Sequence, residues 1–227
     1  MDTSPALSAA REPSAADRVY SYVKEGIVAR RFGTEKLLAE GQIAYALGVS
    51  RTPVREGLLR LEAEGLVRLL PKRGVLVVPV TPEEVSDVLE TRRLIERHAV
   101  RKLVQGGPSA TALAALAGHV AAMTRAVKAH DTVAYVEADR AFHAEIVHRA
   151  GNEILTKLYD SLRDRQLRMG VTNLLGDAAG GVDMSRMRTS LAEHQHILDA
   201  VTKGSLRACD AAVSGHLDGT LELLWRH

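Results

Sequence analysis

The stretch VSRTPVREGLLRLEAEGLV, residues 49–67, decides the fold of the first third of the chain. Aliphatic residues recur in it at helical spacing and predict one helix over residues 52–64, with Gly65 just past its end. The apolar face consists of Val54, Leu58 and Leu61, whereas the start of the helix carries Ser50, Arg51, Thr52 and Arg55. The helix therefore has one face for a core and a basic end free for a partner.

The neighbouring segments supply the other parts of a winged helix-turn-helix over residues 17–80. Apolar periodicity indicates two preceding helices, and Gly48-Val49-Ser50 marks a tight turn before the third. Two leucine-rich or β-branched runs flank the basic tip at 71–74, which predicts a hairpin. The expected elements are helices at 17–31, 42–47 and 52–64 and strands at 66–70 and 75–80.

This order of elements is typical of units that place the third helix in the major groove of DNA. Arginine at the start of that helix suits the two acceptors of a guanine, and backbone amides there favour phosphate. A basic hairpin tip can reach the minor groove or phosphates, and a glycine beside it lets the backbone approach the duplex. Each charge alone is explained equally well by solvation, but the combination predicts binding of double-stranded DNA. The expected contacts are Ser50, Arg51, Thr52, Arg55, Lys72, Arg73 and Gly74.

Composition sets broad limits on the class of protein. Residues 1–80 hold 12 Lys and Arg against 9 Asp and Glu, a local charge of +3 within a total of +2, which fits a polyanionic partner there. The single cysteine, Cys209, leaves no intrachain disulfide, and no apolar run approaches the roughly 20 residues of a membrane helix. We therefore expect a cytoplasmic protein without a membrane partner. The Ala-, Ser- and Pro-rich residues 1–16 predict a disordered leader.

Residues 81–227 carry no strand signal and predict an antiparallel all-helical bundle, so the expected fold class is mainly α. Thr81 can cap the first of these helices, and Pro82 suits its first position. Short Gly- or Asn-containing breaks separate the helices, and residues 176–184 indicate a longer flexible loop. Six helices are expected, at 82–105, 109–130, 132–150, 153–175, 185–203 and 205–226.

Four residues of this bundle are of metal-ligand type. Asp139 and His143 are four residues apart and so project from one face of a helix, while His194 and His216 lie on the last two helices. Three imidazoles and one carboxylate suit a divalent transition metal such as Zn²⁺, Ni²⁺ or Mn²⁺ in a bundle core. Because the chain has nine histidines, the spacing alone also allows four unrelated surface or packing residues.

The run EGQIAYALGVSRTPVREGLLRLEAEGLV (40–67), continued by PKRGV (71–75), resembles the helix-turn-helix and wing of the GntR family of bacterial regulators. Two departures occur: Gly33-Thr34 stands where the family usually has Pro-Gly, and Gly57 where it usually has Ala. Gly57 should cost about 1 kcal/mol of helix stability. Residues 82–226 resemble the FCD-type ligand-binding domain of the FadR subfamily. The matching landmarks are LETRRLIE (89–96), DRAFHAEIV (139–147), EHQHILDAV (193–201) and HL (216–217).

The resemblance implies a metabolite-responsive transcriptional regulator. It places a divalent metal on Asp139, His143, His194 and His216, and makes Arg92 a candidate clamp for the carboxylate of a small organic acid. It also implies a homodimer that reads a palindromic operator, with repression the favoured mode. An FCD-type bundle of six helices is closer to the VanR-type branch than to the acyl-CoA-binding FadR.

Three alternatives stay open at this point. Arg92 could be a surface charge or pair with Glu96. The metal could be purely structural, with no effector. A metal with an open position could also activate water, but a hydrolase is the weaker hypothesis because Glu145, two residues past His143, should face away from the site.

Overall fold

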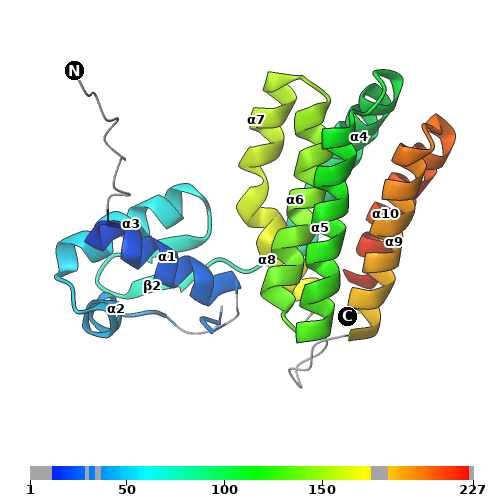
Figure 1. Ribbon diagram of the computed structural model, residues 1–227. Coiled ribbons are helices and arrows are strands. Elements are labelled where there is room, and N and C mark those ends of the chain that lie inside the picture. The colour runs from blue at the N-terminus through cyan, green and yellow to red at the C-terminus, as the bar shows by residue number, and fades with distance from the viewer. Residues whose placement is uncertain (1–11, 29–30, 34–36, 175–183, 225–227) are drawn as a thin grey trace, which may run out of the picture. The chain divides into compact units, whose positions relative to one another are not determined.

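A computed structural model describes four segments of the chain (Figure 1): residues 12–28, 31–33, 37–174 and 184–224. Three features expected from the sequence therefore lie wholly or largely outside the described residues. They are residues 1–11 of the leader, residues 176–183 of the long loop, and Thr34 of the Gly33-Thr34 departure.

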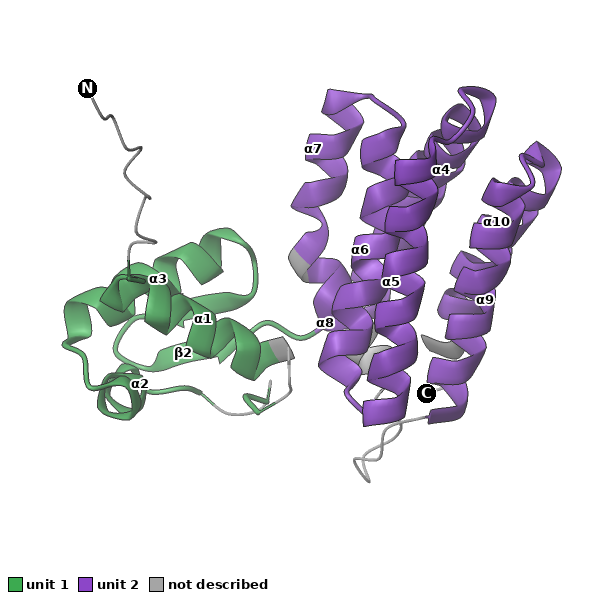
Figure 2. Ribbon diagram, in the orientation of Figure 1, with its two compact units in different colours: residues 1–79 green, residues 80–227 purple. Residues whose placement is uncertain are grey.

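The chain divides into two compact units, residues 1–79 and 80–227 (Figure 2). Helices are the main regular structure of both units, and the only sheet among the described residues is a two-stranded hairpin in the first unit. The expected fold class, mainly α with a winged helix-turn-helix followed by a helical bundle, is confirmed.

The first unit contains three helices followed by a hairpin. Its elements are α1 (Ala15–Val28), α2 (Glu40–Leu47), α3 (Arg51–Ala63), β1 (Val67–Leu70) and β2 (Gly74–Val77). The strands are antiparallel, with Val67 opposite Val77. Helix α1 begins two residues before the expected start because Ser14 caps it: the Asp17 amide donates to Ser14 Oγ at 3.1 Å, and the Ser14 amide donates back to Asp17 Oδ2 at 3.1 Å.

Gly57 is explained by the packing of α1 against α3. It is buried in the middle of α3, and a Cβ added there would lie 2.8 Å from Val19 Cγ1 and 2.9 Å from the Ala16 carbonyl oxygen. The glycine that weakens α3 as an isolated helix thus allows α1 to approach its backbone closely. The surrounding core is aliphatic and includes Val19, Val23, Val54, Leu58 and Leu61.

The second unit has seven helices among the described residues, not the six expected. They are α4 (Pro82–Gln105), α5 (Ala110–Ala129), α6 (Thr132–Arg149), α7 (Glu153–Ser161), α8 (Arg163–Leu174), α9 (Met184–Thr202) and α10 (Leu206–Leu224). The expected helix at 153–175 is interrupted at Leu162, whose amide donates to the Tyr159 carbonyl three residues back instead of four. The Ser161 hydroxyl also donates to the Leu158 carbonyl at 2.6 Å. The helix count therefore gives no support to a six-helix branch of the family.

The five long helices of this unit close a ring. Helix α4 packs on α6 and α10, α6 packs on α5, and α9 packs on both α5 and α10. Helix α8 contacts α4, α6, α9 and α10, so it borders the space that the ring encloses. Side chains that project inward from the ring can therefore meet although they are far apart in the sequence.

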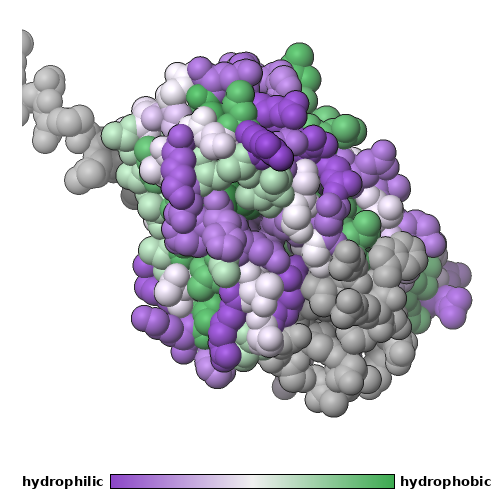
Figure 3. Space-filling view, turned by 90° about the vertical axis from the view of Figure 1, so that its right-hand side faces the viewer, coloured by the Kyte–Doolittle hydropathy of each residue, from purple (hydrophilic) through white to green (hydrophobic). Residues whose placement is uncertain are grey.

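Helix α5 is the one described helix that is long and apolar enough to cross a membrane, with a mean hydropathy of 1.3 over its most apolar window. This corrects the expectation that no such segment exists. The helix is rich in alanine, and it packs on α6 and α9 as a member of the ring. Length and composition alone are weak evidence, since a core helix of a soluble protein has the same properties. The face drawn in Figure 3 is mostly hydrophilic, with hydrophobic residues in small separate patches.

Replacement of Gly57 tests the close packing of α1 on α3. Gly57→Ala should destabilise the first unit by about 1–3 kcal/mol, because the added methyl group displaces α1. This loss should outweigh the gain of about 1 kcal/mol in helix propensity. Gly118→Ala is the matched control. Gly118 lies mid-helix in α5, and an added Cβ would meet open space, so this substitution should stabilise the second unit. Calorimetric unfolding of both full-length variants measures the difference, and equal stabilisation by both would contradict the packing argument.

Candidate functional site

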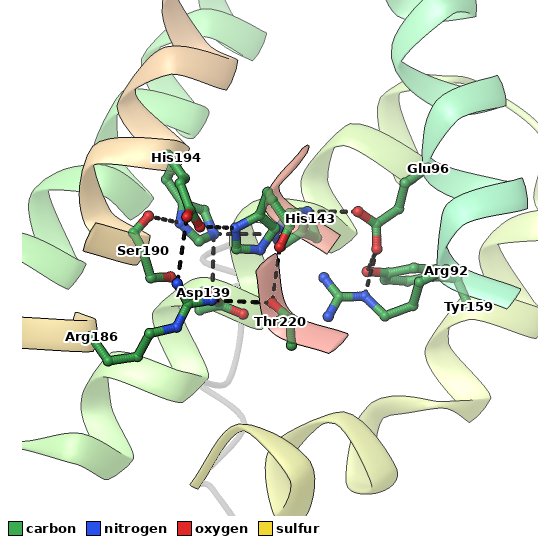
Figure 4. Close-up of polar contacts among 11 residues, drawn as sticks. Arg92, Glu96, Asp139, His143, Tyr159, Arg186, Ser190, His194 and Thr220 are labelled. Carbon is green, nitrogen blue, oxygen red and sulfur yellow. Dashed lines mark hydrogen bonds and ion pairs between the residues drawn. The ribbon is translucent and has the colours of Figure 1, made fainter. Parts of the chain in front are cut away.

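The structure brings Asp139, His143, His194 and His216 together inside the ring of the second unit. Figure 4 labels the first three. Helix α6 supplies Asp139 and His143, α9 supplies His194, and α10 supplies His216. One ligand atom from each residue lies within 4.8 Å of all the others. The remaining histidines of the described residues, among them His148 and His196, are not in this cluster.

The atoms that meet are the Nε2 nitrogens. His143 Nε2 lies 3.0 Å from His194 Nε2 and 3.2 Å from His216 Nε2, and His194 Nε2 lies 3.1 Å from Asp139 Oδ1. The three histidine side chains are 0–3% exposed, whereas the Asp139 side chain keeps 22% of its surface. The cluster is therefore enclosed on the histidine side and accessible beside Asp139.

Each histidine is oriented through its other nitrogen. Nδ1 of His143 lies 2.8 Å from Glu96 Oε2, Nδ1 of His194 lies 2.7 Å from the Ser190 carbonyl, and Nδ1 of His216 lies 2.8 Å from Glu193 Oε2. The acceptors beside Nδ1 of His194 and His216 favour the proton on that nitrogen and a lone pair on Nε2, whereas Glu96 Oε2 lies near Nδ1 of His143 without the geometry of a hydrogen bond. Lone pairs and a carboxylate that face one another repel unless a proton or a cation lies between them.

The ionisation of the cluster suits cation binding. Burial lowers the pKa of His143, and burial together with the nearby His194 lowers the pKa of His216 to about 4, so both rings are neutral near pH 7. Burial alone would raise the pKa of Asp139, but the facing imidazoles, His194 foremost, hold it below its ordinary value. Neutral imidazoles and an ionised carboxylate are the forms that coordinate divalent transition metals.

Arg92 lies beside this cluster and pairs with Glu96, one of the two alternatives left open by the sequence. Arg92 Nε donates to Glu96 Oε1 at 2.7 Å, and the Tyr159 hydroxyl donates to the same oxygen at 2.6 Å. Burial opposes the charge on Glu96, but Arg92 and His143 outweigh it and lower its pKa. Arg92 is only 6% exposed, yet its Nη2 has no hydrogen-bond partner. The Nε of Arg92 is therefore engaged by Glu96, whereas its Nη2 is available to donate to another acceptor.

Sequence reasoning missed the outer partners of the histidines. They are Glu96, which also accepts from Tyr159, on one side and Ser190 and Glu193 on the other (Figure 4 labels all but Glu193). The acceptor for His194 is the backbone carbonyl of Ser190, one turn earlier in the same helix, and any residue type there would provide it. The others come from different helices and have no signal in the linear spacing. Glu145 instead pairs with Arg149 at 2.7 Å.

In the first unit, most of the expected DNA-contacting residues line one open groove. Helix α3, the first residues of α2 and the hairpin tip enclose about 610 Å³, and Arg51, Arg55, Lys72, Arg73 and Gly74 are among the lining residues. Ser50 and Thr52 are exposed beside the start of α3. Ser50 occupies the N-cap position without a side-chain cap bond, so its hydroxyl is not used by the helix.

Gly74 has an internal role that the sequence did not indicate. Its φ of +117° favours glycine, and a Cβ there would lie 2.7 Å from the Leu38 carbonyl oxygen. Leu38 pairs with Val75 as an isolated bridge beside the hairpin, with N–O distances of 2.8 and 2.9 Å. Gly74 was expected to let the backbone approach DNA closely. In this structure it allows the backbone of Leu38 to approach the hairpin closely.

Comparison with known proteins identifies both units. Residues 15–77 match the gntR family of bacterial regulatory proteins, and residues 87–219 match the FCD domain, which confirms the resemblance inferred from the sequence. An HTH-type transcriptional regulator of Agrobacterium vitis is 33% identical over 143 residues, covering 62% of this chain and 82% of that protein. The gluconate operon transcriptional repressor of Bacillus subtilis is 26% identical over 148 residues, covering 64% and 59%.

The fold is also that of a solved regulator. A crystal structure of a GntR transcriptional regulator from Rhodococcus sp. RHA1 has a TM-score of 0.77 to this chain at 23% identity, covering 93% of this chain and 98% of that one.

Metal titration tests the cluster. Calorimetric titration of the metal-free full chain with Zn²⁺, Ni²⁺ or Mn²⁺ should show one ion per chain, and His143→Ala or His216→Ala should abolish binding. Glu193→Gln should weaken binding about 10- to 100-fold, because it loosens the orientation of His216 without removing a ligand. His148→Ala is the control, since His148 pairs with Asp160 outside the cluster. Unchanged affinity in His216→Ala would contradict the assignment.

Proposed function

Because this chain belongs to the gntR family of bacterial regulatory proteins and carries an FCD domain, we propose that it is a metabolite-responsive repressor. In this proposal a small organic acid binds beside a divalent metal in the second unit and weakens the hold of the first unit on DNA. The family matches make the chain a DNA-binding transcriptional regulator and not an enzyme. The observation that carries the proposal is the meeting of three histidine Nε2 atoms and Asp139 inside the ring.

The donor spacing supports a metal with open positions. Ligands at about 2.1 Å from an ion lie about 3.0 Å apart at right angles and about 3.4 Å apart in a tetrahedron. Three of the six distances between donor atoms are 3.0–3.2 Å, of which the two shorter ones are nearer the right-angled value, and all four donor atoms lie within 4.8 Å of one another. A bound ion would supply positive charge and exchangeable positions for a carboxylate. Four protein ligands in such an arrangement leave room for an effector, which favours this version over a purely structural metal.

Arg92 supplies the second contact in the proposal. Its Nε is held by Glu96, so the guanidinium is fixed before any effector arrives. Its unpartnered Nη2 is buried, and a buried donor without an acceptor is costly until one is provided. A carboxylate that reaches both the metal and Arg92 would satisfy this donor.

Ion pairs near the start of α4 support a route from effector to linker. Glu84, in the first turn of α4 and four residues past Val80, accepts from Arg168 of α8 at 2.8 Å and lies 3.4 Å from Arg165. Helix α4 also carries Arg92 and Glu96. An effector that changes the packing of α8 or α4 would therefore alter these ion pairs, which lie close in sequence to the boundary between the units. DNA affinity falls only to the extent that the effector prefers the arrangement that binds DNA poorly.

We propose that the protein binds DNA as a homodimer in the cytoplasm. Two copies of the chain would place two α3 helices in successive major grooves of a palindrome. Ser50, Arg51, Thr52 and Arg55 would meet the major groove, while Lys72, Arg73 and Gly74 would meet the minor groove or backbone. The relative of Bacillus subtilis that is named a gluconate operon repressor supports both repression and an organic-acid effector.

Effector titration tests the sensing half. The metal-loaded chain, bound to a duplex that it has selected from a randomised library, is titrated with a panel of small carboxylates. At least one should weaken DNA binding tenfold or more, and metal removal should abolish the response. Arg92→Lys should keep metal and DNA binding but weaken the effector about tenfold, since lysine lacks the planar fork. Arg93→Lys, at the neighbouring Arg93–Asp218 pair, is the control. A bound metal with no response to any carboxylate would support the structural alternative.

Arginine replacement tests the DNA-reading half. Arg51→Ala and Arg55→Ala should each weaken binding to the selected duplex about tenfold or more, because a guanine contact contributes about 1–3 kcal/mol. Arg125→Ala, an exposed site on α5 in the second unit, removes the same charge and should leave affinity within about twofold. Gel-shift titration at fixed salt measures all three. Equal losses in all three variants would indicate that only net charge matters.

A further inference from the structure

We infer that Glu40 is a positioning residue for Arg55: it aims the arginine at a base edge and thereby sets base specificity. The inference rests on the proposed DNA-reading function of the first unit. It assigns to an acidic residue, on a helix outside the recognition helix, a part in choosing the sequence that is read.

The contact joins two helices of the helix-turn-helix. Glu40 is the first residue of α2, and Arg55 lies one turn into α3. Arg55 Nε donates to Glu40 Oε2 at 3.1 Å. The Arg55 side chain is 65% exposed and that of Glu40 is 28% exposed, so the arginine is held at one edge while most of it faces solvent.

A carboxylate in this groove needs an explanation. Glu40 lines the same groove as Arg51, Arg55, Lys72 and Arg73, where a negative charge reduces the attraction for phosphate. Fold stability is a weak reason, because exposed ion pairs contribute only about 0–1 kcal/mol. The start of α2 favours an acidic side chain through the helix dipole, but this does not require contact with Arg55.

The geometry indicates what the contact does. With Nε engaged by Glu40, the guanidinium keeps its two Nη groups as an outward fork, which matches the O6 and N7 acceptors of guanine. Holding the side chain in advance reduces the entropy lost on binding. The Glu40 carboxylate also repels phosphate oxygens, so Arg55 is kept from the backbone contacts that carry no sequence information. Among the described residues, Arg51 has no such acidic partner, so Arg55 is the arginine whose side chain is oriented by a carboxylate.

The experiment separates specific from non-specific binding. The full-length chain selects duplexes from a randomised library, and affinities are then measured for the enriched duplex and for poly(dI-dC) at one salt concentration. Glu40→Gln should bind poly(dI-dC) as well as or up to about threefold better than the wild type, because a negative charge is gone. Its ratio of specific to non-specific affinity should fall about tenfold. A repeated selection should show relaxed preference at one position of each half-site, the same position that Arg55→Ala relaxes.

Two further variants separate contact from charge. Glu40→Asp keeps the charge but shortens the side chain, so it should relax the same base position with little change on poly(dI-dC). Glu56→Gln, an exposed acidic residue of α3 without an ion pair among the described residues, is the matched charge control and should leave the ratio unchanged. Melting temperatures close to that of the wild type are expected, because the pair is exposed.

A double-mutant cycle decides the inference. In an Arg55→Ala background, Glu40→Gln should no longer change the affinity ratio or any base preference. The inference is overturned if Glu40→Gln lowers both affinities by the same factor, or if it changes base preference when Arg55 is absent. If instead the wild-type chain enriches no duplex, the DNA-reading function itself has failed, and the inference fails with it.

Discussion

Three imidazole nitrogens and one carboxylate oxygen face one another in the interior of a helical ring, and the second unit is organised around this arrangement. Buried acceptors without donors are unfavourable, so the rings need outer partners that orient them, and a cation in the centre would satisfy their lone pairs. Glu96, the Ser190 carbonyl and Glu193 provide the outer partners. Because the donors come from α6, α9 and α10, their mutual distances depend on how those helices pack.

Helix α4 connects this cluster to the rest of the chain. Near its middle, Arg92 and Glu96 form a buried pair that also holds Tyr159 of α7. At its start, Glu84 pairs with α8 beside the boundary between the units, and along its length Arg97 pairs with Asp210 of α10. Removing one member of the buried pair would strand a charge, whereas the exposed pairs contribute little. Helix α4 therefore joins the partners of the cluster to the start of the second unit.

The first unit distributes its constraints differently. Its charges stay exposed around an open groove, where one ion pair joins Glu40 to Arg55. Gly57 lets α1 approach α3, and Gly74 lets the Leu38 segment approach the hairpin. The two glycines therefore allow close packing at two separate places, where α1 meets α3 and where the Leu38 segment meets the hairpin.

Local patterns alone determined much of this protein. Apolar periodicity, turn residues and caps located the helices and strands to within a few residues, apart from α7 and α8, which were expected as one helix, because these signals act over one or two turns. Spacing and family resemblance selected Asp139, His143, His194 and His216 as a set. Tertiary structure decided the rest: the break at Leu162, which no Gly or Pro announces, the role of Gly57, and the partners Glu96, Glu193 and Glu40. Apart from the break at Leu162, each of these depends on residues from another helix, and only the packing of the helices brings such residues into contact.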